Sequence, residues 1–153
     1  MKKNFENLDG FIKDDKHFYP LRVFYEDTDA GEIIYHTNYL KYFERARSSI
    51  LNLLKINQSN LKEEDGIILV VKKVDMNWHK SAKLNDILLI KTCLKYAKNS
   101  SITINQEALK YVGYKNKNEL LVSGVIQIVA INSLYKVQRI NSILNHKFFQ
   151  NKT

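Results

Sequence analysis

The strongest constraint on the fold of this chain is a change in the spacing of apolar residues after Leu54. Between Tyr39 and Leu54, apolar residues recur at helical spacing over about four and a half turns. Thr37 or Asn38 could cap the start of this helix. Because the apolar stripe is broad, we expect the helix to be covered on much of its circumference and to form the centre of the core. Its members are Tyr39, Leu40, Phe43, Ala46, Ile50, Leu51, Leu53 and Leu54.

Beyond the polar connector of residues 62–65, which ends at Gly66, the composition becomes typical of strands separated by turns. In one of the predicted strands, residues 101–112, Ile102, Ile104 and Gln106 alternate with more polar neighbours. This alternation predicts a sheet with one buried and one partly wet face. A further strand is predicted over Leu21–Tyr25, and residues 139–149 have the spacing of a short closing helix. The four strands predicted after Gly66 are residues 67–80, 86–98, 101–112 and 119–132.

This order of elements predicts an α+β domain in which an antiparallel five-stranded sheet wraps around one long central helix. We expect a single domain over residues 21–153, preceded by a loosely docked arm over residues 1–20. Long hairpin strands leave two exposed sheet edges, and such edges are commonly paired with another subunit. The chain is therefore expected to be at least a dimer.

Composition limits the location and the partners of the chain. Cys93 is the only cysteine, which excludes an internal disulfide framework and favours a reducing, cytoplasmic location. The longest apolar runs are far shorter than the roughly 20 residues that span a bilayer. Residues 1–66 carry 10 basic and 12 acidic side chains, whereas residues 67–153 carry 14 basic and 4 acidic ones. The basic part suits a polyanion such as nucleic acid or coenzyme A, or is simply a solvated lysine-rich surface.

Polar, acidic, glycine and imidazole groups converge in residues 23–47, between a strand end and a helix start. This segment resembles the signature of the hotdog-fold acyl-CoA thioesterases of the 4-hydroxybenzoyl-CoA thioesterase type, and is most similar to the Tol–Pal-associated, YbgC-like branch. Further matches to the family lie at Ala82, Leu84 and Asp86, so the resemblance covers roughly residues 21–132. The matching residues are Tyr25, Glu26, Asp27, Thr28, Asp29, Gly31, Ile34, Tyr35, His36, Tyr39, Phe43, Glu44, Ala46 and Arg47.

The resemblance implies that Asp29 is the catalytic carboxylate. Thioester hydrolysis needs a base that deprotonates water or a carboxylate that attacks the carbonyl, and the sequence leaves both open. The resemblance also implies that backbone N–H groups near Tyr35 and His36 polarise the thioester, with Gly31 allowing the tight turn that presents them. Taken alone, Asp29 would be read as a turn or helix-capping residue.

Three further members of the motif have open roles. His36 either orients water or the thioester, or caps and packs at the helix start. Tyr25 is either a pocket wall or a core aromatic residue. Glu44, two helical turns beyond His36, either orients that histidine, lines the site, or forms a salt bridge with Arg47 or Lys41.

Other chemistries have weaker support in the sequence. The four histidines are scattered without the paired spacing of a zinc site, and no serine lies in a nucleophile elbow. We therefore expect no metal and no cofactor. The chain departs from the family at Glu32, where close relatives often carry a second glycine, and at Ser81, which replaces a proline.

Three functions remain to be compared. The first is an acyl-CoA thioesterase, acting on acyl-CoA or acyl carrier protein as a homodimer or homotetramer. The second is a non-catalytic module that binds acyl-CoA or acyl carrier protein on the same fold. The third, a nucleic-acid binder, has no recognition motif to support it, and no nucleic-acid partner is expected.

Overall fold

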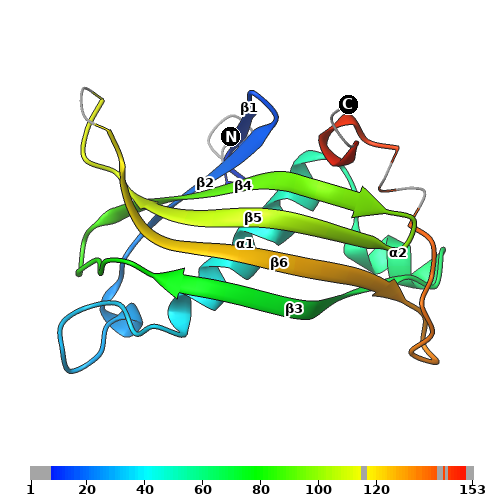
Figure 1. The fold of residues 1–153 in the computed structure, drawn as a ribbon, viewed down its shortest axis with the longest axis horizontal. Coiled ribbons are helices and arrows are strands. Elements are labelled where there is room, and N and C mark those ends of the chain that lie inside the picture. The colour runs from blue at the N-terminus through cyan, green and yellow to red at the C-terminus, as the bar shows by residue number, and fades with distance from the viewer. Residues whose placement is uncertain (1–7, 115–116, 141–142, 144, 151–153) are drawn as a thin grey trace, which may run out of the picture.

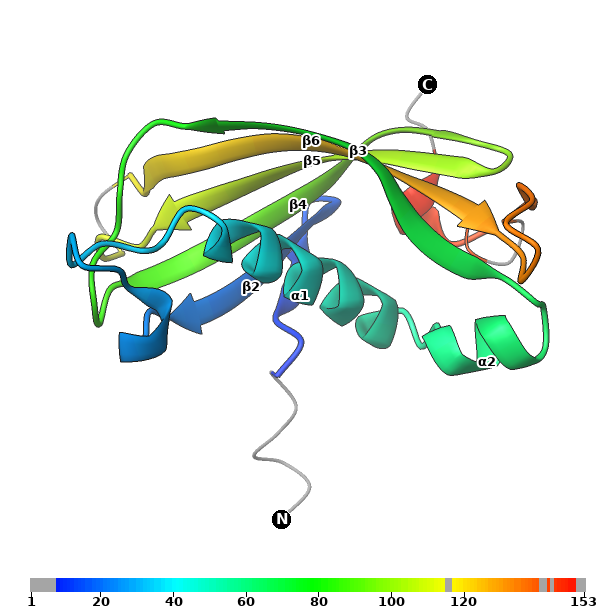
Figure 2. The same cartoon turned by 90° about the horizontal axis from the view of Figure 1, so that it is seen from below.

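A curved sheet of six antiparallel strands forms one layer of the structure, and one long helix lies across its inner face (Figure 1, Figure 2). The computed structural model describes residues 8–114, 117–140, 143 and 145–150. The strand order is β1-β2-β4-β5-β6-β3, so β1 and β3 are the two edges. The strands are β1 (Phe11–Lys13), β2 (Lys16–Arg22), β3 (Ile68–Trp78), β4 (Ile87–Lys98), β5 (Ser101–Lys110) and β6 (Glu119–Ile131).

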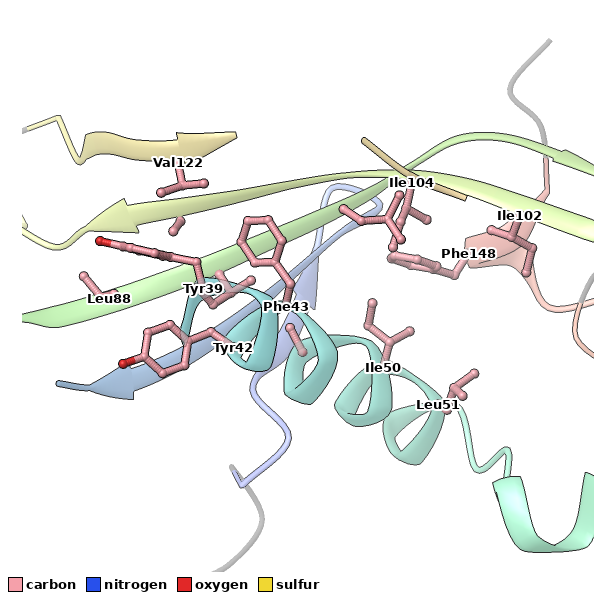
Figure 3. Close-up of a cluster of buried hydrophobic side chains, with 14 of the residues drawn as sticks. Tyr39, Tyr42, Phe43, Ile50, Leu51, Leu88, Ile102, Ile104, Val122 and Phe148 are labelled. Carbon is pink, nitrogen blue, oxygen red and sulfur yellow. The ribbon is translucent and has the colours of Figure 1, made fainter. Parts of the chain in front are cut away.

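The long helix α1 (Asn38–Leu53) confirms the helical stripe of the sequence to within one residue at each end. Tyr39, Phe43 and Ile50 are buried, and Figure 3 shows them pointing from α1 towards the sheet. They meet inward residues of β4 and β5, including Leu88 and Ile104, which are also buried. The apolar stripe and the inner sheet face therefore make one core, as the α+β prediction required.

The four strands predicted after residue 66 are present at nearly the predicted positions. β4 and β5 are joined by a tight turn at Asn99 and Ser100, since Lys98 pairs with Ser101. On β5 the predicted inner face is buried, with Ile102 and Ile104 at 3% exposure and Gln106 at 0%. β3 is bulged between Val71 and Lys73, where its register against β6 shifts.

The N-terminal segment differs from the expected loose arm. Lys16–Arg22 pairs along its whole length with β4, and Phe11–Lys13 pairs in turn with β2. The sheet consequently has six strands rather than five. The pairing is non-local, joining His17 to Thr92 across 75 positions of sequence, which is why local composition did not reveal it.

Two connections also differ from expectation. A short helix, α2 (Gln58–Glu63), precedes and overlaps the polar connector of residues 62–65. It is capped by the Asn57 side chain, which accepts from Ser59 N–H and Asn60 N–H. In the predicted closing helix, residues 141, 142 and 144 lie outside the described part, and the 3₁₀ turn η3 (Lys147–Phe149) follows. Among the described residues, no helix is long and apolar enough to cross a membrane.

Candidate functional site

The motif residues form a closed loop between the end of β2 and the start of α1. The loop begins with the 3₁₀ turn η2 (Tyr25–Asp27) and then doubles back on itself. Asp29 N–H donates to Ile33 O at 3.0 Å, and a single β-bridge joins Thr28 to Ile34. Because the two arms of the loop are hydrogen-bonded, the acidic turn is held beside the residues that lead into α1.

Asp27 ties this loop to the helix. Its carboxylate accepts from Phe24 N–H at 2.7 Å, and its carbonyl accepts from Tyr35 N–H and from the Asn38 side chain, each at 2.9 Å. Asp27 and Asn38 are both buried. A buried carboxylate that is used in this way is structural, and we assign Asp27 to support of the loop. The sequence placed Asp27 in the motif but did not reveal this task.

Asp29 has a different environment from Asp27. It is exposed, and its Oδ1 accepts from Gly31 N–H at 2.7 Å, whereas its Oδ2 makes no hydrogen bond among the described residues. Gly31 permits this close approach, since a Cβ at that position would lie 3.0 Å from Asp29 Oδ1. The carboxylate is therefore held in one orientation while remaining accessible to water or a ligand.

Glu32 occupies a backbone conformation that favours glycine. Its φ is 60°, in the left-handed region where a side chain is unfavourable. The Glu32 N–H donates to Asp29 O at 2.9 Å, so the turn needs this conformation. The structure thus gives a physical reason for the second glycine that relatives often carry at this position.

The start of α1 supplies two uncommitted backbone donors. Tyr35 N–H, expected to polarise the thioester, is occupied by Asp27 O. The N–H groups of His36 and Thr37 donate to no other group among the described residues. No side-chain cap covers them, because the Thr37 side chain makes no capping hydrogen bond. The helix N-terminus therefore presents free N–H groups, with the favourable end of the helix dipole, beside the loop that carries Asp29.

The His36 side chain is exposed and contacts aromatic rings rather than charged side chains. Its imidazole lies edge-on to the Tyr35 ring at 4.7 Å and to the Trp78 ring at 6.1 Å, measured between ring centres. The Trp78 indole N–H donates to His36 O at 3.3 Å. His36 and Trp78, together with Tyr39 and Lys80, line an open cleft of about 230 Å³. His36 is thus at the surface of a cleft, where it can meet a ligand.

The turn between β3 and β4 braces the loop from the other side. Ile34 N–H donates to Ala82 O at 3.0 Å, and Ile33 forms a β-bridge with Lys83. Asp86 closes this turn by accepting from Lys83 N–H and from the Lys110 ammonium, both at 2.8 Å. Although partial burial opposes it, these hydrogen bonds lower the pKa of Asp86. The residues between Ala82 and Asp86 that match the family therefore support the loop that carries Asp29.

Two members of the expected site are not part of this cluster. Glu44 is exposed and accepts from the Ser48 hydroxyl at 2.7 Å, one turn further along α1, so it neither orients His36 nor forms an ion pair with Lys41 or Arg47. Tyr25 is 82% exposed, so the interpretation as a core aromatic residue is wrong. Helical spacing predicted that Glu44 lies on the face of His36, but its side chain is exposed and its carboxylate is bound by Ser48 instead.

A buried polar network, missed by the sequence analysis, joins α1 to the sheet. The Gln106 side chain donates to Phe43 O at 3.0 Å and to Thr92 Oγ1 at 2.9 Å, and it accepts from Arg47 at 2.9 Å. Burial lowers the pKa of Arg47. The signal in the sequence was a glutamine on the apolar face of a strand, which predicts a buried group with dedicated partners.

Two tyrosines of α1 are buried between the helix and the sheet. Burial raises the pKa of Tyr39 to about 12, and burial together with the negative charge of Asp27 raises the pKa of Tyr42. Both phenols therefore remain neutral at physiological pH and pack as core residues, with their rings 5.9 Å apart in an edge-to-face contact (Figure 3).

An apolar cavity of about 150 Å³ lies between the second half of α1 and the sheet. Its polar rim comes from α1, at Glu44, Arg47 and Ser48. The other residues that line the cavity are Ile50, Leu51, Gln58, Leu69, Val70, Val71, Ile102, Ile104, Ile128, Ile143 and Phe149.

In the described part of the chain, no group of three or more histidine, cysteine or acidic side chains is arranged to hold a metal ion.

Comparisons with known proteins find relatives of this chain among the acyl-CoA thioesterases. The acyl-CoA thioesterase YbgC of Haemophilus influenzae is 37% identical over 120 residues, which are 78% of this chain and 83% of that protein. The acyl-CoA thioester hydrolase YbgC of Escherichia coli O157:H7 is 32% identical over 76% of this chain and 82% of its own length.

A solved structure described as a probable thioesterase from Bartonella henselae superposes with a TM-score of 0.74 at 28% identity, covering 82% of this chain and 98% of that one. A gentisyl-coenzyme A thioesterase structure superposes equally well, with a TM-score of 0.74 at 23% identity over 84% of this chain and 99% of that one. At that identity the likeness bears on the fold alone, which is the hotdog fold anticipated from the sequence. Residues 31–115 match the family model of the thioesterase superfamily, so the chain belongs to that superfamily.

Proposed function

We propose that the chain hydrolyses acyl-CoA thioesters, with Asp29 as general base or nucleophile. The observation that carries this proposal is that one hydrogen-bonded loop holds an oriented, exposed carboxylate and leads into a helix start with free N–H groups. Asp29 either removes a proton from water as its oxygen attacks the carbonyl, or attacks the carbonyl itself to form an anhydride that water then hydrolyses. In both routes the C–S bond breaks, the thiolate takes up a proton and the free acid leaves.

The N–H groups of His36 and Thr37 are suited to the negative charge that develops on the carbonyl oxygen. Donors fixed before the reaction need no reorganisation, and the loss of one such donor in other hydrolases costs on the order of a hundredfold in rate. Gly31 acts through Asp29, by allowing the contact that orients its carboxylate. Tyr35 and Tyr25 contribute exposed aromatic surface beside the reacting groups.

The substrate is an acyl group carried by coenzyme A or acyl carrier protein. The cleft beside His36 supports an apolar acyl group, because Ile33, Ile34 and Tyr39 line it and burying each methylene is worth about 0.8 kcal/mol. Glu44 lines a separate apolar cavity beside the second half of α1, which makes it a candidate contact to a longer acyl chain rather than a partner of His36.

We further propose that the chain acts in the cytoplasm as a homodimer or homotetramer. The edge strand β3 supports this assembly, because it presents 11 residues with one unpaired side. Val71 and Val74 of β3 are 40–45% exposed, which leaves apolar surface at this edge for a second subunit to cover. Sedimentation equilibrium tests this part of the proposal, and a monomer at all concentrations contradicts it.

Thiol release from short-chain, long-chain and aromatic acyl-CoAs tests the activity. We expect turnover of at least one of these substrates by the purified chain without added metal or cofactor. The alternative is a non-catalytic module that binds acyl-CoA or acyl carrier protein on the same fold. Isothermal titration with the same panel separates the two, because binding without thiol release supports the module and contradicts the hydrolase.

A further inference from the structure

Trp78 connects the edge of the sheet to the start of α1. It is the only tryptophan of the chain and the last residue of β3. Its indole N–H donates to His36 O at 3.3 Å, and its ring lies edge-on to the imidazole of His36. About half of its side-chain surface is exposed, in the cleft that it lines with His36. The hydrogen bond thus joins positions 36 and 78 at the point where the reaction is proposed to occur.

The carbonyl that accepts this hydrogen bond belongs to a particular peptide group. His36 C=O and Thr37 N–H share one planar peptide unit, which is trans because no cis bond is present among the described residues. In a trans peptide the C=O and N–H bonds point in opposite directions. When Trp78 holds the oxygen of His36, it therefore also fixes the direction of the Thr37 N–H, which points away from the indole.

The same hydrogen bond affects the strength of the donor. Hydrogen bonds in a chain polarise one another, so a donor on the carbonyl oxygen makes the N–H of that peptide a better donor, by about 10–30% per bond. Thr37 N–H is one of the two uncommitted donors at this helix start. No other hydrogen bond to His36 O is present outside the helix ladder in the described residues, so Trp78 supplies this effect from the side chain.

We propose that Trp78 is a positioning residue for the thioester hydrolysis: it orients and polarises the peptide group that presents Thr37 N–H to the developing oxyanion. The inference rests on the proposed function. Trp78 acts through the backbone of His36 and not by touching the reacting atoms, so its loss is expected to lower the rate of the chemical step with little change in substrate binding.

Because Trp78 is the only tryptophan in the sequence, growth on a tryptophan analogue changes this one side chain and gives a sharp test. An analogue in which sulfur replaces the indole N–H keeps the ring and removes the donor at Trp78 alone, and Trp78→Phe makes a similar change genetically. We expect kcat to fall about threefold to tenfold, as for loss of one hydrogen bond, with KM changed less than twofold. Ser123→Ala is the matched control, since it removes the 2.8 Å hydrogen bond to His79 near the end of β3 without contacting His36, and should leave both constants unchanged.

Two kinetic outcomes overturn the proposal. Unchanged kcat in both altered proteins shows that the hydrogen bond is dispensable, and a raised KM with unchanged kcat makes Trp78 a binding contact instead. The amide ¹⁵N resonance of Thr37 gives a readout that does not depend on turnover. It should shift in the analogue protein and remain in place in Ser123→Ala, and a Thr37 resonance that does not move refutes the positioning role. Absence of turnover in the wild type, with the shift present, contradicts the proposed function alone.

Discussion

Two buried threonines on neighbouring strands should respond in opposite ways to the same substitution. Thr92 on β4 is fully buried, and its Oγ1 accepts from the Gln106 side chain at 2.9 Å. Thr103 on β5 is 3% exposed, and its Oγ1 has no hydrogen-bond partner within the described part of the chain. Replacement by valine keeps the branched shape and removes only the hydroxyl. The pair therefore isolates hydrogen bonding from packing.

The expected free energies follow from the partners that are lost. Thr92→Val leaves one N–H of the buried Gln106 amide unpaired, which costs about 1–3 kcal/mol of stability. Thr103→Val removes a hydroxyl that is already buried without a partner, so the free energy of unfolding should rise by about 1 kcal/mol. For a chain of this length each kcal/mol moves Tm by roughly 2–4 °C.

Thermal unfolding followed by circular dichroism measures both shifts. Protein concentration must be equal, because assembly would raise Tm by mass action. We expect Tm of Thr92→Val to fall and Tm of Thr103→Val to rise by roughly 2–4 °C. A fall in Tm of similar size in both variants would refute the reasoning. The effect of the substitution would then not depend on whether the threonine hydroxyl has a hydrogen-bond partner.

Three further predictions concern the loop and the N-terminal strand. Glu32→Gly should raise stability by about 0.5–1 kcal/mol, because it relieves a φ of 60°, and an unchanged urea midpoint contradicts this. Gly31→Ala should lower kcat/KM about tenfold or more with little loss of stability, as its Cβ would displace the Asp29 carboxylate; wild-type kinetics argue against that contact. Burial lowers the pKa of His17 below 6.5, so the unfolded chain binds a proton that the folded chain does not, and stability should fall as pH drops from 6.5 through the folded pKa. Urea midpoints between pH 7.5 and 5 test this, and His17→Gln should flatten the profile.

The parts of the fold that depend on local pattern could be predicted from the sequence. The helix at residues 38–53 and the four later strands follow from apolar spacing, and the motif placed Asp29, Gly31 and His36 in one loop. Pairing of residues 16–22 with β4 could not be predicted, because it depends on contacts distant in sequence. For the same reason helical periodicity could not decide whether Glu44 lies under the sheet or in solvent.

The candidate site, like the fold, has features that the sequence predicts and features that only the structure reveals. The resemblance identified the peptide region that faces the thioester but not which N–H groups are free. Only the fold reveals that Asp27 occupies Tyr35 N–H, which leaves His36 and Thr37 as donors. The role of Asp27 itself depends on its burial, which a pattern of alternating acidic residues does not encode.

The most direct test of the catalytic role of Asp29 is the rate of acyl-CoA thiol release by Asp29→Asn, measured beside Asp27→Asn. Asparagine keeps the shape of each side chain and removes its charge. Because Asp29 is exposed and Asp27 is a buried support, Asp29→Asn should retain the wild-type Tm and lose about a hundredfold or more in kcat, whereas Asp27→Asn should chiefly lower Tm. Wild-type kcat in folded Asp29→Asn would contradict the account.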